Sequence, residues 1–182
     1  RKLSKSLGNS PDPLNIIEKY GTDANRFTVL YLSPLGQDVK MDVDVKAQDI
    51  PSMEIGRNFA NKIWNAGRFL LMKLEANGLS ETNNIIENHS LRTDEFSFSD
   101  KWILSRMNST IKNIHQALDN YRVNDYTKIL YDFIWRDFCD WYVEIVKVQL
   151  NRSNIPSYNQ ALMKHAINLY EEILKLLHPI MP

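Results

Sequence analysis

The sequence lacks the features that define several large classes of protein. It holds a single cysteine, Cys139, so no internal disulfide can form, which fits a reducing compartment. Lysine plus arginine number 22 and aspartate plus glutamate number 22, so no net charge draws the whole chain to nucleic acid or to a membrane surface. The sequence has no run of 18 apolar residues that could cross a bilayer and no apolar leader at its start. Any site for a polyanion must therefore be local.

What the chain does contain suits a globular protein of moderate size. Its 182 residues are 43% hydrophobic and 24% charged, with six glycines and seven prolines, which excludes a collagen-like or wholly disordered chain. A chain of this length buries about 70% of its surface on folding and needs no disulfide or metal to hold its core. It opens at Arg1 without an initiator methionine and stops just after a helical pattern, so we expect a piece of a longer protein.

The first 50 residues predict an appendage of loops and short helices. Asp12-Pro13 is typical of a helix start and Gly21 of a helix end, so one short helix is expected over 13–20. A second is expected from Thr22 or Asp23 to Leu32, ended by Ser33-Pro34. Residues 36–50 show neither a helical nor a strand period and predict an extended connector.

From residue 51 the pattern is helical to the end of the chain. Long helices are expected over about 51–76, 99–121, 124–151 and 157–178, with a polar loop over 79–98. The third and fourth are apolar on more than one side and should pack on more than one side. The predicted fold is all-α: a helical bundle (51–182) with a short N-terminal loop–helix appendage (1–50).

The basic loop at the N-terminus could bind phosphate. Lys2 and Lys5 stand three apart, Ser4 and Ser6 add hydroxyls, and Gly8 allows a tight backbone turn. Ammonium groups and backbone N–H donors in such a loop can surround phosphate oxygens. A frayed basic terminus is the alternative interpretation of the same residues.

The helix expected over 51–76 has one basic and amide-rich face. At about 100° per residue its polar members fall within an arc of roughly 140°, and no Asp or Glu lies between positions 57 and 73. Cations can bind phosphates, amides can read base edges and rings can stack on bases, so the pattern suits a single-stranded RNA loop. An ordinary solvated face, opposite the apolar stripe of Phe59 and Ile63, is the alternative. The arc consists of Arg57, Asn58, Asn61, Lys62, Asn65 and Arg68, with Phe69 and Met72 among them.

Other polar and aromatic residues favour structural roles. Asp137, Asp140 and Glu144 share a helix face and could hold a cation, but a solvated acidic stripe is the favoured interpretation. Cys139 is expected in the core, as is Trp141, whereas Trp64 borders the basic arc and could go either way.

Ordered motifs along the chain resemble the class I aminoacyl-tRNA synthetases and, among them, the valyl-tRNA synthetase family. KLSKS at 2–6 is similar to the KMSKS signature, with Leu3 in place of the usual methionine. The stretch from Asp12 to Arg26 resembles the DP, YG and D-x-x-R elements that follow this signature. Further similar segments are GQD at 36–38, GRNF-x-NK-x-WN at 56–65, D-x-WILSR at 100–106, YDF-x-W at 131–135, FCDWY at 138–142 and LHP-x-MP at 177–182.

The resemblance implies roles for the N-terminal loop. In this family the signature loop closes over ATP while the amino acid is activated, so Lys5 and Lys2 carry over as catalytic and ATP-binding cations, with Ser4 and Ser6 as ATP-binding hydroxyls. Mg²⁺ would accompany ATP as its counter-ion, and no structural metal is expected. Because the Rossmann domain that the loop covers is absent from these residues, the resemblance implies that the isolated chain does not activate valine.

The same resemblance implies that the body is an anticodon-binding domain. Its partners would be the anticodon loop of valine tRNA, bound by the arc from Arg57 to Phe69, and the missing Rossmann catalytic domain, in a cytoplasmic protein that contacts no membrane. Two alternatives stay open. One is a helical protein-interaction module, and the other is the equivalent part of isoleucyl-tRNA synthetase, against which the GQD and RNF-x-NK-x-WN elements argue.

Overall fold

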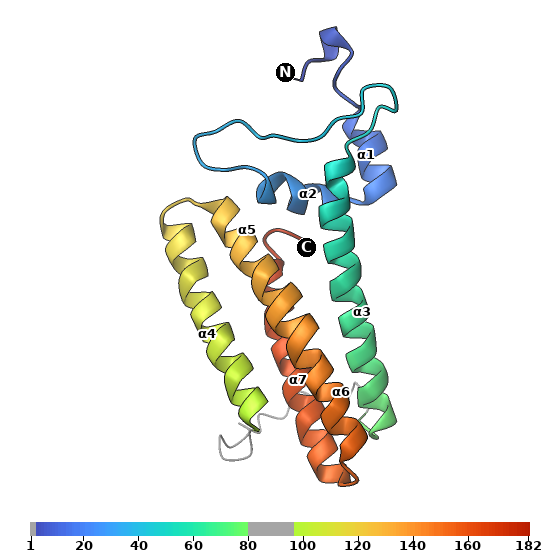
Figure 1. Ribbon diagram of the computed structural model, residues 1–182, viewed down its shortest axis with the longest axis vertical. Helices are drawn as coiled ribbons and strands as arrows, with labels where there is room; N and C mark the ends of the chain where they lie inside the picture. The colour runs from blue at the N-terminus through green and yellow to red at the C-terminus, as the bar shows by residue number, and fades with distance from the viewer. Residues whose placement is uncertain (1–2, 80–96) are drawn as a thin grey trace. The chain divides into compact units, whose positions relative to one another are not determined.

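The computed structural model of the chain describes residues 3–79 and 97–182. Every regular element among these residues is a helix, so the expected all-α class is confirmed (Figure 1). The chain divides into two compact units. The first comprises Arg1–Asn61, Asn113–Ile129 and Leu177–Pro182, and the second comprises Lys62–Lys112 and Leu130–Leu176. The predicted functional division at residue 50 stays a prediction.

Two short helices open the first unit as the sequence predicts. Helix α1 (Pro13–Tyr20) begins at Asp12, whose carboxylate accepts a hydrogen bond of 3.0 Å from the Leu14 N–H. Gly21, at φ 92°, ends α1 and precedes α2 (Thr22–Tyr31). Glycine suits this turn because residues with a side chain rarely adopt a positive φ.

The connector over 36–50 is folded rather than simply extended, which corrects the expectation. Asp44 and Asp49 form an antiparallel bridge that closes a turn. Lys19 of α1 donates to the Asp49 carboxylate at 2.5 Å, and the Tyr20 hydroxyl donates to the same oxygen at 3.1 Å. Because Met41 and Ile50 also pack on an apolar cluster around Tyr20, the connector is tied to α1 by apolar as well as polar contacts.

A 3₁₀ turn, η2 (Pro51–Met53), leads into the long helix α3 (Glu54–Ala76). The predicted apolar stripe of this helix is buried throughout. In the first unit its N-terminal part lies directly against α2: Phe27 and Phe59 have ring centroids 4.5 Å apart, and the Gly56 N–H donates to the Thr28 hydroxyl at 3.1 Å. The stripe consists of Phe59, Ile63, Ala66, Leu70 and Leu74.

The second unit is a four-helix bundle by itself. The Tyr170 hydroxyl donates to the Ile63 carbonyl at 3.0 Å and joins α7 to α3, while the Tyr142 hydroxyl donates to Asp100 at 2.8 Å and joins η4 to α4. Figure 1 shows these stretches running alongside one another. The bundle is built from parts of α3, α4 (Phe98–Asp119), η4 (Phe133–Tyr142), α6 (Val143–Arg152) and α7 (Pro156–Leu177).

In the helix expected over 99–121, the apolar period of the sequence predicts a buried stripe of Met107, Ile111, Ile114, Leu118 and Tyr121, but α4 follows a different one. Leu118 is exposed, and Tyr121 lies beyond the helix end at φ 56°, so neither belongs to the core. The sequence pattern misplaced the stripe because Thr110 and Ala117, which are weak hydrophobic signals, occupy buried positions. The buried stripe is Ile103, Met107, Thr110, Ile114 and Ala117.

The helix expected over 124–151 is continuous but contains a π-helical segment. It runs as α5 (Val123–Asp132), η4 and α6, and η4 is π-helical along its ten residues. Hydrogen bonds from i to i+5 advance the helix more slowly than α-helical ones, so the buried face shifts in phase along the chain. Phe138 and Tyr142 are buried, while Trp141 is 59% exposed and Val148 is exposed. The core role expected for Trp141 is therefore wrong.

Candidate nucleic-acid interface

The predicted arc on α3 consists largely of exposed side chains. Asn58 and Asn61, in the first unit, and Asn65 and Arg68, in the second, are exposed. Trp64 is 72% exposed, which resolves the question that its sequence position left open. The arc therefore offers amide groups, one guanidinium and a large ring to a ligand.

Arg57, at the start of the arc, is paired within the first unit. One terminal nitrogen lies 2.7 Å from a carboxylate oxygen of Glu54, and the guanidinium lies 5.5 Å from the centre of the Tyr20 ring. Glu54 stands one turn before Arg57, outside the stretch that lacks acids. An i, i+3 spacing of opposite charges is a signal that the sequence contained and that could have identified this pair.

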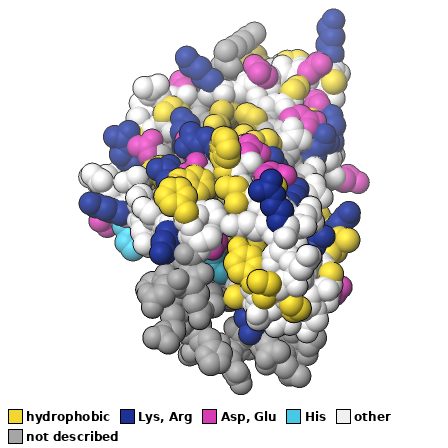
Figure 2. Space-filling model, turned by 60° about the horizontal axis from the view of Figure 1, so that its bottom comes forward, with side chains coloured by type: hydrophobic (Ala, Val, Ile, Leu, Met, Phe, Trp, Pro, Cys, Tyr) yellow, Lys and Arg dark blue, Asp and Glu magenta, His cyan; other side chains and the backbone are white. Residues whose placement is uncertain are grey.

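Lys62 is paired within the second unit in a way the sequence pattern did not indicate. Its ammonium lies 2.6 Å from Asp140 of η4 and 4.9 Å from the centre of the Trp135 ring. Phe69 is half-buried, and the Lys147 ammonium lies 5.0 Å from its ring centre. These partners are distant in sequence, so only the fold reveals that the arc on α3 is partly neutralised. Figure 2 shows basic and acidic side chains interspersed in this manner over one face of the molecule.

The predicted phosphate-binding loop is described in part. Lys2 lies outside the described residues, and the side chain of Lys5 is likewise not described. Residues Lys5–Leu7 form a 3₁₀ turn, η1, and the hydroxyls of Ser4 and Ser6 are hydrogen bonded at 2.8 Å. The Asn9 side chain accepts from the Ser4 N–H at 2.8 Å and closes the loop. Two adjacent hydroxyls on a tight turn are compatible with a phosphate ligand.

The three carboxylates that share a face in the sequence pattern each have a basic partner. Asp137 is buried and accepts from Arg106 at 2.8 Å and from Arg136 at 3.0 Å. The prediction that Asp137 is a solvated residue is therefore wrong. Asp140 pairs with Lys62, and Glu144 pairs with Lys147 at 2.6 Å. No group of three or more potential metal ligands occurs within 3–79 and 97–182. Cys139 is buried, and burial raises the pKa of its thiol to about 12, so it is a core residue as expected.

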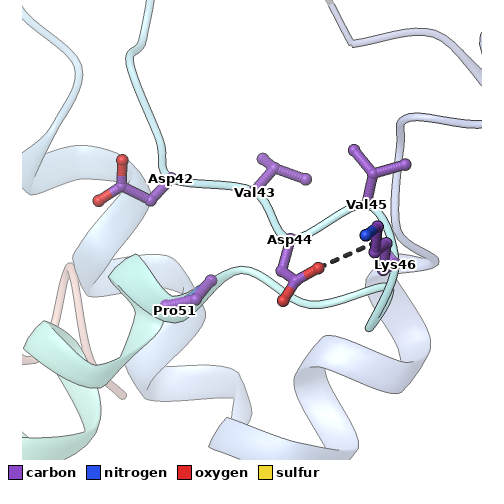
Figure 3. Close-up of a pocket in the computed structure, with 6 residues that line it drawn as sticks. All are labelled: Asp42, Val43, Asp44, Val45, Lys46 and Pro51. Carbon is purple, nitrogen blue, oxygen red and sulfur yellow. Dashed lines mark hydrogen bonds between the residues drawn. The ribbon is translucent and has the colours of Figure 1, made fainter.

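An open hollow of about 480 Å³ lies over the connector in the first unit (Figure 3). Its acidic residues include Asp44, whose carboxylate accepts from the N–H groups of Lys46 and Ala47 at 3.0 Å and so stabilises its own turn. The hollow therefore belongs to the loop structure and offers no convergent polar groups. Within the described part of the chain, no helix has the length and apolarity needed to cross a membrane.

Two family models match the chain. Residues 100–182 match the anticodon-binding domain of tRNA ligase, and residues 1–42 match the class I tRNA synthetases (I, L, M and V). Helix α3 lies between the two matched stretches.

Known proteins similar to the chain are valine–tRNA ligases. It is 44% identical to that of Chlorobaculum tepidum, over all of the chain and 20% of the relative. The corresponding enzymes of Nostoc sp. and Borrelia garinii subsp. bavariensis are each 42% identical over all of the chain, which covers 18% and 19% of their lengths. The chain thus spans about a fifth of the length of the curated relatives it matches.

Proposed function

Because this chain belongs to the class I tRNA synthetase family, as a segment similar to valine–tRNA ligases along its whole length, we propose that it binds the anticodon region of valine tRNA. The observation that carries the proposal is this whole-length likeness, which includes the stretch 100–182 that matches the anticodon-binding model. The relatives named above are all valine enzymes, which favours this function over a protein-interaction module and over the isoleucine enzyme.

We assign base recognition to the outward face of α3. The amides of Asn58, Asn61 and Asn65 can both donate to and accept from base edges, and each lies about one turn from the next along the helix. Trp64 offers an exposed ring on which an unstacked base can lie. Phe69 is half-buried, so it can contribute the edge of its ring rather than a full face.

The three cations of the arc should contribute unequally. Arg57 and Lys62 already pair with Glu54 and Asp140, so a phosphate must compete with these carboxylates. Arg68 is exposed and forms no ion pair within 4 Å with any described carboxylate. We therefore expect Arg68 to contribute most to binding.

In an intact ligase we propose that the KLSKS loop contacts ATP. Negative charge builds up on the phosphate oxygens as pyrophosphate leaves, and the ammonium groups of Lys5 and Lys2 would stabilise it. Ser4 and Ser6 would donate from the tight turn at η1. Mg²⁺ would arrive with ATP. Since the chain covers about a fifth of its relatives, this chemistry requires the remainder of such an enzyme.

The anticodon proposal is tested by titrating the chain with valine tRNA and with the same tRNA altered at the middle anticodon base. Tighter binding of the unaltered tRNA is expected, because base edges rather than phosphates carry the sequence information. Arg68→Ala should weaken binding by about 1–3 kcal/mol without lowering the melting temperature. Asn120→Ala, which changes an exposed side chain outside α3, serves as the control. Equal affinity for both RNAs would rule out anticodon readout by this chain.

A further inference from the structure

Helix α4 carries a second acid-free polar surface, which the sequence motifs did not single out. No Asp or Glu occurs between Lys101 and Leu118. Within the second unit, the outward side of α4 is exposed. It consists of Lys101, Ser105, Asn108, Ser109 and Lys112.

The two lysines of this surface lie on the same side of α4. Lys112 follows Lys101 by eleven positions, which places them within about 20° of each other around the helix and about 16 Å apart along it. Neither ammonium lies within 4 Å of a carboxylate from residues 3–79 or 97–182, whereas Lys62, Lys147 and Lys175 all do. Both charges are therefore available to an anionic ligand.

Arg106 adds a fixed cation beside this surface. Its Nε donates to Asp137 at 2.8 Å. Because Asp137 is buried, this hydrogen bond fixes the guanidinium from its protein-facing side. The side chain of Arg106 is still 43% exposed. Its terminal nitrogens make no hydrogen bond to any described residue and can donate to a further acceptor. A guanidinium positioned in this way offers donors to phosphate oxygens at little further entropy cost.

We propose that this surface of α4 (Lys101, Ser105, Asn108, Ser109 and Lys112), together with Arg106 beside it, binds phosphate groups of the RNA backbone. Lysine, arginine, serine and asparagine side chains are the usual partners of phosphate and sugar oxygens, and such contacts orient an RNA without reading its sequence. The inference rests on the proposed function, since α4 opens the stretch that matches the anticodon-binding model. It gives α4 a positioning role and leaves base readout to α3.

An RNA backbone suits this surface better than a lipid surface does. A helix that lies in a membrane interface needs a continuous apolar side next to its basic side. The apolar stripe of α4, from Ile103 to Ile114, is buried in the protein instead. Ser105 and Asn108 place a hydroxyl and an amide between the two lysines, where they can donate to phosphate oxygens. The Ser109 hydroxyl donates to the Ser105 carbonyl at 3.0 Å, so its oxygen can accept from a ribose hydroxyl.

The test compares two pairs of lysines with identical spacing. In the full 182-residue chain, Lys101→Gln with Lys112→Gln removes both charges from α4, and Lys164→Gln with Lys175→Gln removes two charges eleven residues apart on α7. Binding of valine tRNA and of its middle-anticodon variant is measured by fluorescence anisotropy over a series of salt concentrations. The α4 pair should reduce the slope of log K against log salt by about 1.5. Affinity for both RNAs should fall by the same factor.

Three outcomes are decisive. Replacing both α4 lysines by arginine should keep the original slope, because the charge is retained, and this result together with a normal melting curve supports the proposal. If the α4 glutamine pair matches the α7 pair in slope and affinity while Arg68→Ala still weakens binding, phosphate contact by α4 is refuted and the anticodon proposal stands. If the unsubstituted chain binds neither RNA, both proposals are refuted, whether or not it binds anionic vesicles in a parallel titration.

Discussion

Gly56 shows how a single atom governs the contact between α3 and α2 in the first unit. A Cβ built on this residue would lie 2.2 Å from the carbonyl oxygen of Ala24 and 2.7 Å from the Thr28 hydroxyl. The nearer atom is backbone, so it cannot rotate away as a side chain can. The close approach also permits the hydrogen bond from the Gly56 N–H to Thr28.

Gly56→Ala should therefore destabilise the chain, although glycine to alanine inside a helix ordinarily stabilises it by about 1 kcal/mol. Forcing extra volume into such a contact costs about 1–3 kcal/mol, so the sign is reversed. Urea denaturation followed by circular dichroism measures the change. Asn61→Ala, at an exposed position of the same helix, is the control and should be neutral or slightly stabilising. A Gly56→Ala protein more stable than the original would contradict the packing described.

Gly67 presents a milder version of the same constraint in the second unit. Its hypothetical Cβ would lie 2.4 Å from the Tyr170 hydroxyl. That hydroxyl is the far end of a side chain, which can shift at the expense of its hydrogen bond to the Ile63 carbonyl. The two glycines of α3 thus differ in their neighbours. The side chain of α7 that faces Gly67 can move aside, whereas the backbone of α2 that faces Gly56 cannot.

At the level of the element, the π-helical segment η4 decides which aromatic residues enter the core. An α-helical period of 4 and 3 residues from Phe138 leads to Trp141, Ile145 and Val148. The observed core continues instead from Phe138 through Tyr142 to Val146. This corresponds to a phase shift of one residue, which the i to i+5 hydrogen bonding of η4 produces.

The phase shift predicts opposite costs for two aromatic residues three positions apart. Phe138→Ala removes a fully buried ring and should cost about 3–5 kcal/mol of unfolding free energy. Trp141→Ala removes a ring that is 59% exposed and should cost less than about 1 kcal/mol. Chemical denaturation of the two variants provides the comparison. Equal large losses would mean that Trp141 is a core residue and that the π-helical phase is wrong.

The same elements show what sequence reasoning can and cannot predict here. Capping at Asp12 and the apolar period of α3 are local signals, and the structure confirms both. The π-helical segment of η4 has no composition signal, so an α-helical period placed Trp141 on the wrong side. The partner of Lys62 could not be predicted either, because Asp140 approaches it only through the packing of η4 on α3.

For the whole molecule, charge distribution matters more than net charge. The chain is neutral, yet positions 57–73 and 101–118 contain no acid, whereas the lysines and arginines elsewhere in the sequence are interspersed with carboxylates. A neutral chain with local basic surfaces should bind RNA weakly and with strong salt dependence, since only a few phosphates are contacted. Stability, in contrast, depends on a buried polar cluster in the second unit.

That cluster centres on Asp100. One carboxylate oxygen accepts from Ser97 at the start of α4, in the reciprocal pattern of a capping box, and the other accepts from the Tyr142 hydroxyl at 2.8 Å. His165 of α7 lies with Nε2 3.9 Å from the latter oxygen and its ring edge-on to Tyr142. Burial lowers the pKa of the His165 imidazole, and the Asp100 carboxylate opposes this only in part.

The lowered pKa of His165 predicts that the chain loses stability in mild acid. Above about pH 6.5, the ordinary histidine value, the imidazole is neutral in both the folded and the unfolded chain. As the pH falls below this value the unfolded chain takes up a proton that the folded chain resists, so the free energy of unfolding decreases until the pH reaches the lower folded pKa. Urea midpoints measured from pH 7.5 to 5 should show this decline. His165→Gln should flatten it, whereas His115→Gln, at an exposed position on α4, should leave it unchanged. An identical pH profile in the His165 variant would place the acid sensitivity elsewhere in the chain.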